Sequence, residues 1–314
     1  MIEVEGLTRH FFSGRLGKQR VEAVDDVSFN IKRGETLGLV GGSGCGKTTL
    51  GRLLLRLIEP TSGRIAFDGV DILRLKRREM RRLRPRMQMI FQDPDTSLNP
   101  RMTSLESISE PLKLKGDLTR GEIEDEVSRL MEKVGLSPEH LGRRPHQLSG
   151  GQNQRVVLAR VLASNPEFIV ADEPLSALDV SVQAQIFGLL SEMKRDRNIA
   201  FLFISHDLNI VRLMSDRVAV MDRGKIVEVG PTEEIFCHPL HPRTRELVSS
   251  AGMDGRLTLM LKESLTSTAT RRPGPRMDGV CDDNPMDSKS SRLIINAGCR
   301  CRNNQTKSPK DMAY

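Results

Sequence analysis

A glycine-rich stretch, GGSGCGKT at residues 41–48, constrains this 314-residue chain more than any other feature. It fits the pattern G-x-x-x-x-G-K-[ST], it follows the short apolar run TLGLV, and it opens the segment KTTLGRLLLRLI, which has helical spacing. A strand, a glycine loop and a helix in this order form a phosphate-binding P-loop, in which backbone N–H groups face the phosphates. The sequence therefore predicts an α/β nucleotide-binding core.

Each residue type in this loop has a physical task. The glycines let the backbone fold closely around phosphates, Lys47 supplies a point charge to the β- and γ-phosphates, and the hydroxyl of Thr48 is a hard oxygen ligand suited to Mg²⁺. We expect the loop to bind the phosphates of a nucleotide with Mg²⁺, which the family resemblance described below implies to be ATP, through Gly41, Gly42, Ser43, Gly44, Cys45, Gly46, Lys47, Thr48 and Thr49.

Cys45 lies inside the loop between two glycines, and two interpretations are open. Buried thiols commonly act as small fillers, so Cys45 can simply pack under the loop. If the sulfur is reachable, Lys47 and the helix N-terminus favour a thiolate, and maleimide reagents are then expected to inactivate the protein unless Mg-ATP protects it.

Polar residues follow three further predicted strands. Asp172 and Glu173 end the buried run FIVADE, Gln92 follows MQMIF, and His206 follows AFLFI. In open α/β sheets ligands bind at the carboxyl ends of the strands, so these side chains are expected in the nucleotide cleft. Asp172 is expected to act on Mg²⁺, and Glu173 is expected to orient and polarise the attacking water.

The remaining pattern predicts the layout of the fold. Residues 2–4 and 20–31 alternate like antiparallel strands, whereas two buried strands at 167–171 and 200–204 flank a helix and form a βαβ crossover. Residues 104–135 are amphipathic and helical. We predict a P-loop NTPase core with a mostly parallel sheet, an N-terminal antiparallel β subdomain and an inserted α-helical subdomain at about residues 95–165.

Composition narrows the function further. No apolar run approaches the ~20 residues of a membrane helix, and the N-terminus has no signal-peptide core. The net charge is +7, but only 4% of residues are aromatic, which leaves little for base stacking. The basic run at residues 74–86 is interpreted as a solvated helical face. We expect a cytoplasmic protein without a nucleic acid partner, which meets a membrane only through other subunits.

The stretch LSGGQ at residues 148–152 stands directly ahead of a helix. A helix N-terminus favours an anion, although Ser-Gly-Gly is also the pattern of an ordinary N-cap. Together the P-loop, FQDP, LSGGQ, VADE, SALD and SHD occur in an order and spacing, over about residues 1–248, that resemble the ATP-binding subunits of ABC transporters. LSGGQ is the signature motif of that family.

The resemblance implies composite sites. In the family two ATPase domains meet head to tail, and the signature of one binds the γ-phosphate held by the P-loop of the other. Carried over by motif, the signature residues here are Ser149, Gly150, Gly151 and Gln152. The implied partners are a second ATPase subunit, identical or related, two integral membrane permease subunits at the cytoplasmic face of the cell membrane and, indirectly, an extracytoplasmic binding protein.

The resemblance also implies roles for single residues. Gln92 would sense Mg²⁺ and the attacking water and relay to the membrane subunit, and His206 would contact the γ-phosphate. Asp179 of SALD would organise the dimer contact. Phe11 resembles the aromatic that stacks on adenine, and a core position is the alternative, because Phe12 is adjacent.

Longer stretches of the sequence resemble one subfamily. MIFQDPDTSLNPRM and VEVGPTEEIFCHPLHPRTREL are similar to the dipeptide, oligopeptide and nickel importer ATPases, and TLGR after the P-loop is most like the second ATPase subunit of peptide systems. The implied function is ATP hydrolysis coupled to peptide uptake. A nickel or other solute importer is the alternative. A soluble ABC ATPase is less favoured, because such proteins usually carry two ATPase domains or a coiled-coil insertion.

Some residues depart from the subfamily pattern. Gly42 stands where Glu is usual, and Asn153 stands where a charged or longer residue is usual. The expected ATP-binding domain covers residues 1–250, and residues 251–314 are expected to form a loosely ordered tail or appendage. Its cysteines lack the HPRC-like context of an iron–sulfur site and are interpreted as solvated: Cys281, Cys299 and Cys301.

Overall fold

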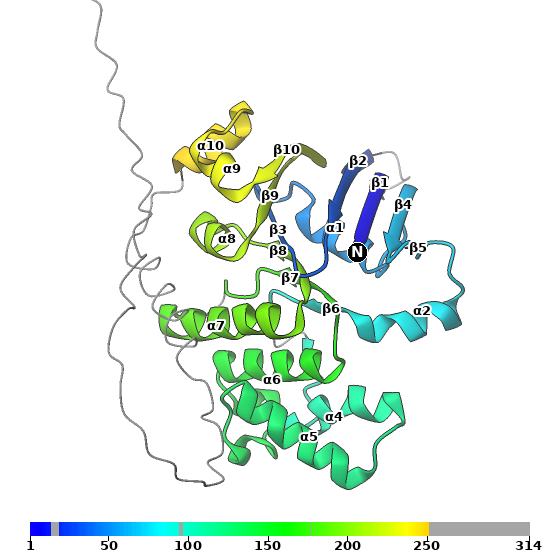
Figure 1. Cartoon of the computed structure of the whole chain (residues 1–314), viewed down its shortest axis with the longest axis vertical. Helices are drawn as coiled ribbons and strands as arrows, with labels where there is room; N and C mark the ends of the chain where they lie inside the picture. Colours follow the sequence, from blue (N-terminus) through cyan, green and yellow to red (C-terminus); the bar gives the residue numbers. More distant parts are fainter. Residues whose placement is uncertain (14–18, 94–96, 177, 251–314) are drawn as a thin grey trace, which may run out of the picture. The chain divides into compact units, whose positions relative to one another are not determined.

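The computed structural model of the chain describes residues 1–13, 19–93, 97–176 and 178–250. The tail expected after residue 250, with its three cysteines, lies outside the described residues. The described residues form two β-sheets and a set of helices (Figure 1).

The larger sheet has six strands in the order β10-β9-β3-β8-β7-β6. Its strands are β3 (Thr36–Gly41), β6 (Met87–Ile90), β7 (Phe168–Asp172), β8 (Ala200–Ile204), β9 (Arg217–Asp222) and β10 (Lys225–Pro231). Every neighbouring pair is parallel except β9 with β10, so the predicted mostly parallel sheet is confirmed. β9 and β10 form a hairpin, whose turn residues Arg223 and Gly224 both have positive φ, as a two-residue turn of this kind requires.

The smaller sheet is antiparallel, with the order β2-β1-β4-β5. It consists of β1 (Ile2–Ser13), β2 (Gln19–Ile31), β4 (Ser62–Phe67) and β5 (Val70–Asp71). The sequence pattern indicated only the first three residues of β1 and missed β4. The cause is tertiary: β4 is exposed at its start, and its pairing with β1, from Ile2 opposite Phe67 onward, supplies the order that its own residues do not.

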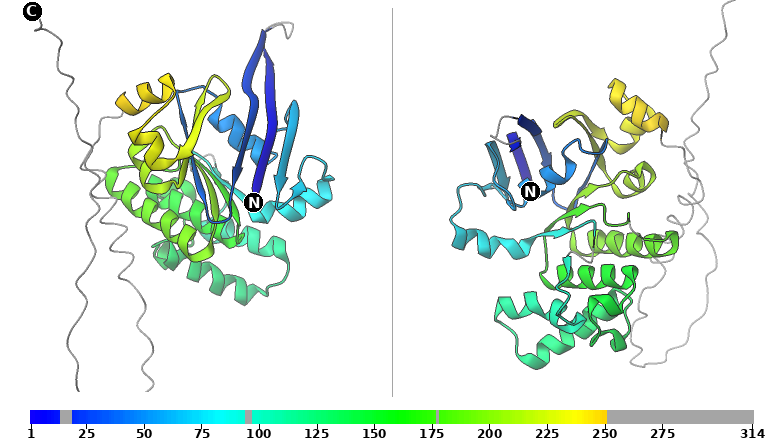
Figure 2. Two further views of the ribbon diagram at one scale, coloured as in Figure 1. Left: turned by 45° about the horizontal axis from the view of Figure 1, so that its top comes forward. Right: turned by 180° about the vertical axis from the view of Figure 1, so that it is seen from behind.

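Helix α1 (Lys47–Leu54) lies between the two sheets (Figure 2). Leu50, Leu53 and Leu54 are fully buried in one apolar cluster with residues of both sheets. The predicted helix to residue 58 is wrong by one turn, because Arg56 has a left-handed backbone with φ 48°. Arg84 then donates to the carbonyl oxygens of Leu55 and Arg56, which would otherwise be unpaired at this helix end.

Helices α6 (Gly150–Ala163), α7 (Val180–Arg197) and α8 (Leu208–Met214) lie along the other face of the larger sheet (Figure 1). Helices α4 (Ser104–Lys115) and α5 (Arg120–Lys133) pack against α6, on the side away from the sheet. Thr103 and Thr119 cap α4 and α5 with Glu106 and Glu122 in reciprocal capping boxes, which explains why the predicted helical stretch divides into two helices. No helix in the described ranges is long and apolar enough to cross a bilayer.

The remaining elements are short. They are α2 (Arg77–Leu83), α9 (Thr232–Cys237), α10 (Pro242–Ser250) and the 3₁₀ turns η1 (Arg84–Arg86), η2 (Pro138–His140) and η3 (Pro145–Gln147). In α2 the side chains of Arg77, Arg78, Arg81 and Arg82 are exposed, in agreement with the solvated helical face expected for the basic run.

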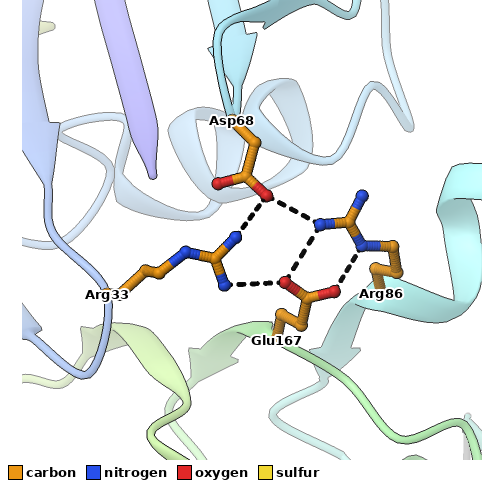
Figure 3. A network of polar contacts seen from close by, with 4 residues as sticks. All are labelled: Arg33, Asp68, Arg86 and Glu167. Carbon is orange, nitrogen blue, oxygen red and sulfur yellow. Dashed lines mark hydrogen bonds and ion pairs between the residues drawn. The ribbon is translucent and has the colours of Figure 1, made fainter.

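A four-residue ionic network joins the two sheets at the amino-terminal edge of β7 (Figure 3). Arg33 donates to Asp68 Oδ2 over 2.6 Å and to Glu167 Oε2 over 2.8 Å. Arg86 donates to the same Asp68 oxygen over 2.7 Å, and it also donates hydrogen bonds to both carboxylate oxygens of Glu167. The Arg86 hydrogen bonds, with those of Arg33 in support, hold the pKa of Glu167 at about 2.

We predict that this network contributes stability that acid removes. The depressed pKa means that Glu167 stabilises the fold above the ordinary pKa of a glutamate, and that this stability is lost as the pH falls from about 5 toward 2. Because the Glu167 side chain remains 33% exposed, solvent screens the charges, and Glu167→Gln should lower the free energy of unfolding by only about 1 kcal/mol at pH 7.

Denaturant titrations of the full chain at several pH values test this. The difference between wild type and Glu167→Gln should shrink as the pH falls. Glu124→Gln is the control, since its pair with Arg120 is a solvated contact within α5 and its loss should change stability much less. A difference that stays constant with pH would contradict the assignment.

Candidate nucleotide site

The P-loop lies between β3 and α1 and is folded for phosphate binding. Lys47 Nζ donates to the carbonyl oxygens of Gly41 at 2.9 Å and Gly42 at 3.1 Å, so the ammonium group lies within the loop. Gly46 has φ 110°, and a Cβ there would stand 2.0 Å from the Ala23 carbonyl oxygen on β2. No other residue type fits that position, so the smaller sheet helps to fix the loop.

Cys45 is buried under this loop, so the reactive-thiolate interpretation is wrong. The side chain is 8% exposed, and burial raises the pKa of its thiol despite the opposing charge of Lys47. The filler interpretation is the one that fits. Burial could not be read from the sequence, because it depends on the packing of the loop against β9 and β2.

The predicted metal-binding oxygens face each other. Thr48, at the start of α1, donates its hydroxyl to Asp172 Oδ1 at the end of β7 over 3.2 Å. Asp172 is 4% exposed, and burial raises the pKa of its carboxyl, with neighbouring Glu173 adding to the effect. A buried carboxylate beside a hydroxyl forms a hard donor set, and a divalent cation would offset the cost of burying the charge. These residues therefore fit Mg²⁺.

Glu173 stands at the centre of the second cluster. Its backbone is left-handed, with φ 47°, and its N–H donates to the Ile204 carbonyl oxygen at the end of β8 over 2.9 Å. The carboxylate Oε2 accepts from Gln92 Nε2 over 2.9 Å, and His206 Nδ1 lies 3.4 Å from the same oxygen. Gln92 and His206, which follow two other strands, thus both meet one carboxylate oxygen of Glu173, as their predicted place at the strand ends requires.

The signature segment caps α6. Ser149 Oγ accepts from Gln152 N, and Gln152 Oε1 accepts from Ser149 N, so the two residues form a capping box. A Cβ at Gly151 would come within 2.7 Å of Val182 on α7, whereas a Cβ at Gly150 would meet nothing within 4 Å. Gly150 is exposed, and packing within the described chain does not require a glycine there.

The signature and the P-loop do not meet in this chain. No hydrogen bond or ion pair among the described residues joins residues 41–49 to residues 149–152. The phosphate loop, Asp172 and the Glu173 cluster therefore form one assembly, and the signature forms a separate surface.

Two buried side chains around the signature were missed by the sequence reasoning. His140 in η2 is 8% exposed, with Nδ1 3.1 Å from the Ser137 carbonyl oxygen and Nε2 3.1 Å from Gln152 Nε2. Its ring therefore supports the Gln152 amide, with the proton on Nδ1. Gln154 is 1% exposed and donates to the Pro174 carbonyl oxygen. No signal in the sequence distinguishes either residue from a surface His or Gln.

Two further predicted residues lie elsewhere. The Phe11 side chain is 37% exposed on β1 and lies under the Arg9 guanidinium at 4.6 Å, so the core interpretation is wrong. Asp179 is the N-cap of α7 and accepts from Val182 N over 3.0 Å. Its exposed position leaves its expected dimer contact neither supported nor contradicted.

These features together are typical of a P-loop nucleoside triphosphatase: a phosphate-binding loop, a hydroxyl and a carboxylate suited to a cation, and a glutamate in contact with Gln and His. The model of the ABC transporter family matches residues 24–176. The chain is 49% identical over 252 residues to the oligopeptide transport ATP-binding protein OppF of Bacillus subtilis, covering 80% of this chain and 82% of that one. It is also 49% identical over 261 residues to AppF of the same organism, covering 81% and 79%.

Solved structures agree. The post-hydrolysis dimer of the ATP-binding cassette MJ0796, bound to ADP and Pi, superposes with a TM-score of 0.67 at 29% identity over 74% of this chain and 99% of that one. The cbiO1 protein of Clostridium perfringens gives 0.65 at 30% identity over 83% and 98%. The chain belongs to the ABC transporter family, and it is an ATPase of the ATP-binding-cassette type.

Burial predicts a slow reaction of Cys45 with thiol reagents. Maleimide should label Cys237, whose side chain is partly exposed, well before Cys45. Mass spectrometry of each cysteine peptide over time measures the two rates, and the same experiment in denaturant gives the rate of the unfolded chain. Labelling of native Cys45 as fast as that of Cys237 would contradict the structure.

Proposed function

We propose that the chain is the ATP-hydrolysing subunit of a peptide importer, and that it works in a head-to-tail dimer of ATPase domains. The observation that carries the proposal is the separation of the exposed signature from an otherwise assembled P-loop site. A capped helix N-terminus with an open glycine favours a phosphate supplied by another chain. The names of the relatives, oligopeptide transport ATP-binding proteins, support peptides as the cargo. Nickel or another small solute is the alternative.

In this proposal the P-loop holds the nucleotide. Backbone N–H groups of residues 41–49 and the Lys47 ammonium bind the phosphates, and Phe11 offers an exposed ring for the adenine. Thr48, Asp172 and Gln92 would hold Mg²⁺ through their oxygens, and the ion would supply positive charge that offsets the charge of the phosphates.

Glu173 acts on the attacking water. Its carboxylate accepts a hydrogen bond from the water and draws a proton from it as the water oxygen attacks the γ-phosphorus, while the bond from the γ-phosphorus to the oxygen bridging to the β-phosphate breaks and ADP leaves. Gln92 and His206 both contact the same oxygen, Oε2, of this carboxylate. His206 also offers a donor to the γ-phosphate, as the family resemblance implies. The signature of the second subunit closes the site on this chain, and the signature of this chain, Ser149 to Gln152, closes the site on the second subunit.

The implied assembly has further members. We propose a second ATPase subunit, two membrane permease subunits at the cytoplasmic face and, indirectly, an extracytoplasmic binding protein. Asp179, exposed at the start of α7, is proposed to lie at the contact between the two ATPase subunits.

Replacing the proposed catalytic carboxylate tests the reaction. Glu173→Gln keeps the size of the side chain but cannot take a proton, so turnover should fall by roughly 10²–10⁴-fold while ATP still binds. Steady-state hydrolysis and ATP binding by the assembled transporter measure the two properties. Near-normal hydrolysis by the variant would refute the role of Glu173.

Composite sites predict a crossed pattern of damage. In an assembly with a different second subunit, Ser149→Arg should impair the site whose P-loop belongs to the partner, and Lys47→Ala should impair the site on this chain. Photo-crosslinking of azido-ATP to each subunit separately reports which site is affected. Loss at the same site in both variants would rule out the head-to-tail arrangement.

A further inference from the structure

A buried hydrogen bond joins the signature helix to the turn that carries the catalytic glutamate. Gln154 Nε2, in α6, donates to the Pro174 carbonyl oxygen over 3.0 Å. Gln154 follows the signature residue Gln152 by two positions, and Pro174 directly follows Glu173. Both Gln154 and Pro174 are buried. No other hydrogen bond among the described residues reaches the Pro174 carbonyl oxygen.

Stability alone does not account for an amide at this position. Gln154 Oε1 is buried and has no hydrogen-bond partner in the described part of the chain. One polar atom of the side chain is thus satisfied and the other is left desolvated, so the net gain in stability is small. What the amide does provide is a fixed direction between α6 and the turn.

The turn is built to pass on a displacement of that carbonyl. The proline ring locks φ of Pro174 and restricts the residue before it, which is Glu173. Glu173 is already left-handed, and its carbonyl oxygen accepts from both the N–H and the hydroxyl of Ser176. Only ψ of Pro174 separates its carbonyl from this restrained backbone, so a shift of the Pro174 carbonyl acts on Glu173 over a short path with few free dihedral angles.

We propose that Gln154 is a positioning residue that couples the two ATP sites of the dimer. This rests on the proposed function, in which the signature faces the partner's nucleotide and Glu173 faces the chain's own. When the signature closes on the partner's nucleotide, α6 carries the Gln154 amide with it, and the hydrogen bond to Pro174 brings Glu173 into place. Occupancy of one site thereby sets hydrolysis at the other.

The test compares two amide-to-methionine changes in the assembled transporter. Gln154→Met removes the link from α6. Gln183→Met is the matched control, since Gln183 Nε2 donates to the carbonyl oxygen of Leu175 in the same turn over 3.0 Å, but from α7. Each variant loses one amide–carbonyl hydrogen bond, and only one of them lies on the signature helix. Gln154→Leu, made in parallel, repeats the first change with a different apolar side chain.

We expect Gln154→Met to lower kcat for ATP by about three- to tenfold, the usual worth of one such hydrogen bond, with KM changed less than about twofold. The Hill coefficient for ATP should fall to about 1, because the sites no longer communicate. Melting temperatures should stay within about 3 °C of wild type, since the number of unpaired buried polar atoms is unchanged. Gln183→Met should keep the wild-type kcat and Hill coefficient.

Three results would overturn the inference: a non-cooperative wild type, a Gln154→Met enzyme with the wild-type Hill coefficient, or equal losses in the two methionine variants. The wild-type complex and Ser149→Arg are measured in the same assay. A wild type that hydrolyses ATP and depends on Ser149 upholds the proposed function even where Gln154 fails, whereas hydrolysis indifferent to Ser149 refutes the composite site itself.

Discussion

The backbone hydrogen bond from Glu173 N–H to the Ile204 carbonyl oxygen is the constraint on which the site depends. It extends the β7–β8 pairing one residue beyond β7 and holds Glu173 in a left-handed conformation that costs on the order of 1 kcal/mol or more. In return the carboxylate turns away from the strand direction and meets Gln92 and His206. Parallel pairing thus brings residues distant in sequence to one oxygen.

The phosphate loop depends on a second constraint, the packing of α1 between two sheets. The antiparallel sheet buries one side of α1 and places the Ala23 carbonyl against Gly46, so the loop cannot move without disturbing β2. The Arg33–Asp68–Arg86–Glu167 network holds the same two sheets together at the amino-terminal end of β7, where no ligand is needed. Ionic contacts position the scaffold, and apolar packing positions the loop.

Sequence reasoning succeeded for local structure that adjacent residues determine. The P-loop, the Asp172–Glu173 pair and the buried strands before them were predicted, because local patterns determine them. The reasoning failed where a distant contact decides the outcome: β4 becomes a strand through its pairing with β1, and Cys45 becomes poorly accessible through burial. His140 and Gln154 could not have been found, because their importance lies in which atoms they face.

The two glycines of the signature differ in what packing within the chain requires of them. Gly151 is required from within, since any side chain there would collide with Val182 of α7. Gly150 faces open space, so packing among the described residues does not require a glycine there. In the proposed dimer, the open position leaves room for the nucleotide of the second subunit to approach the helix N-terminus. His140 and the capping box hold Gln152 and Ser149 in place. The buried hydrogen bond from Gln154 to the Pro174 carbonyl oxygen then connects the same helix to the turn that carries Glu173, the proposed catalytic carboxylate.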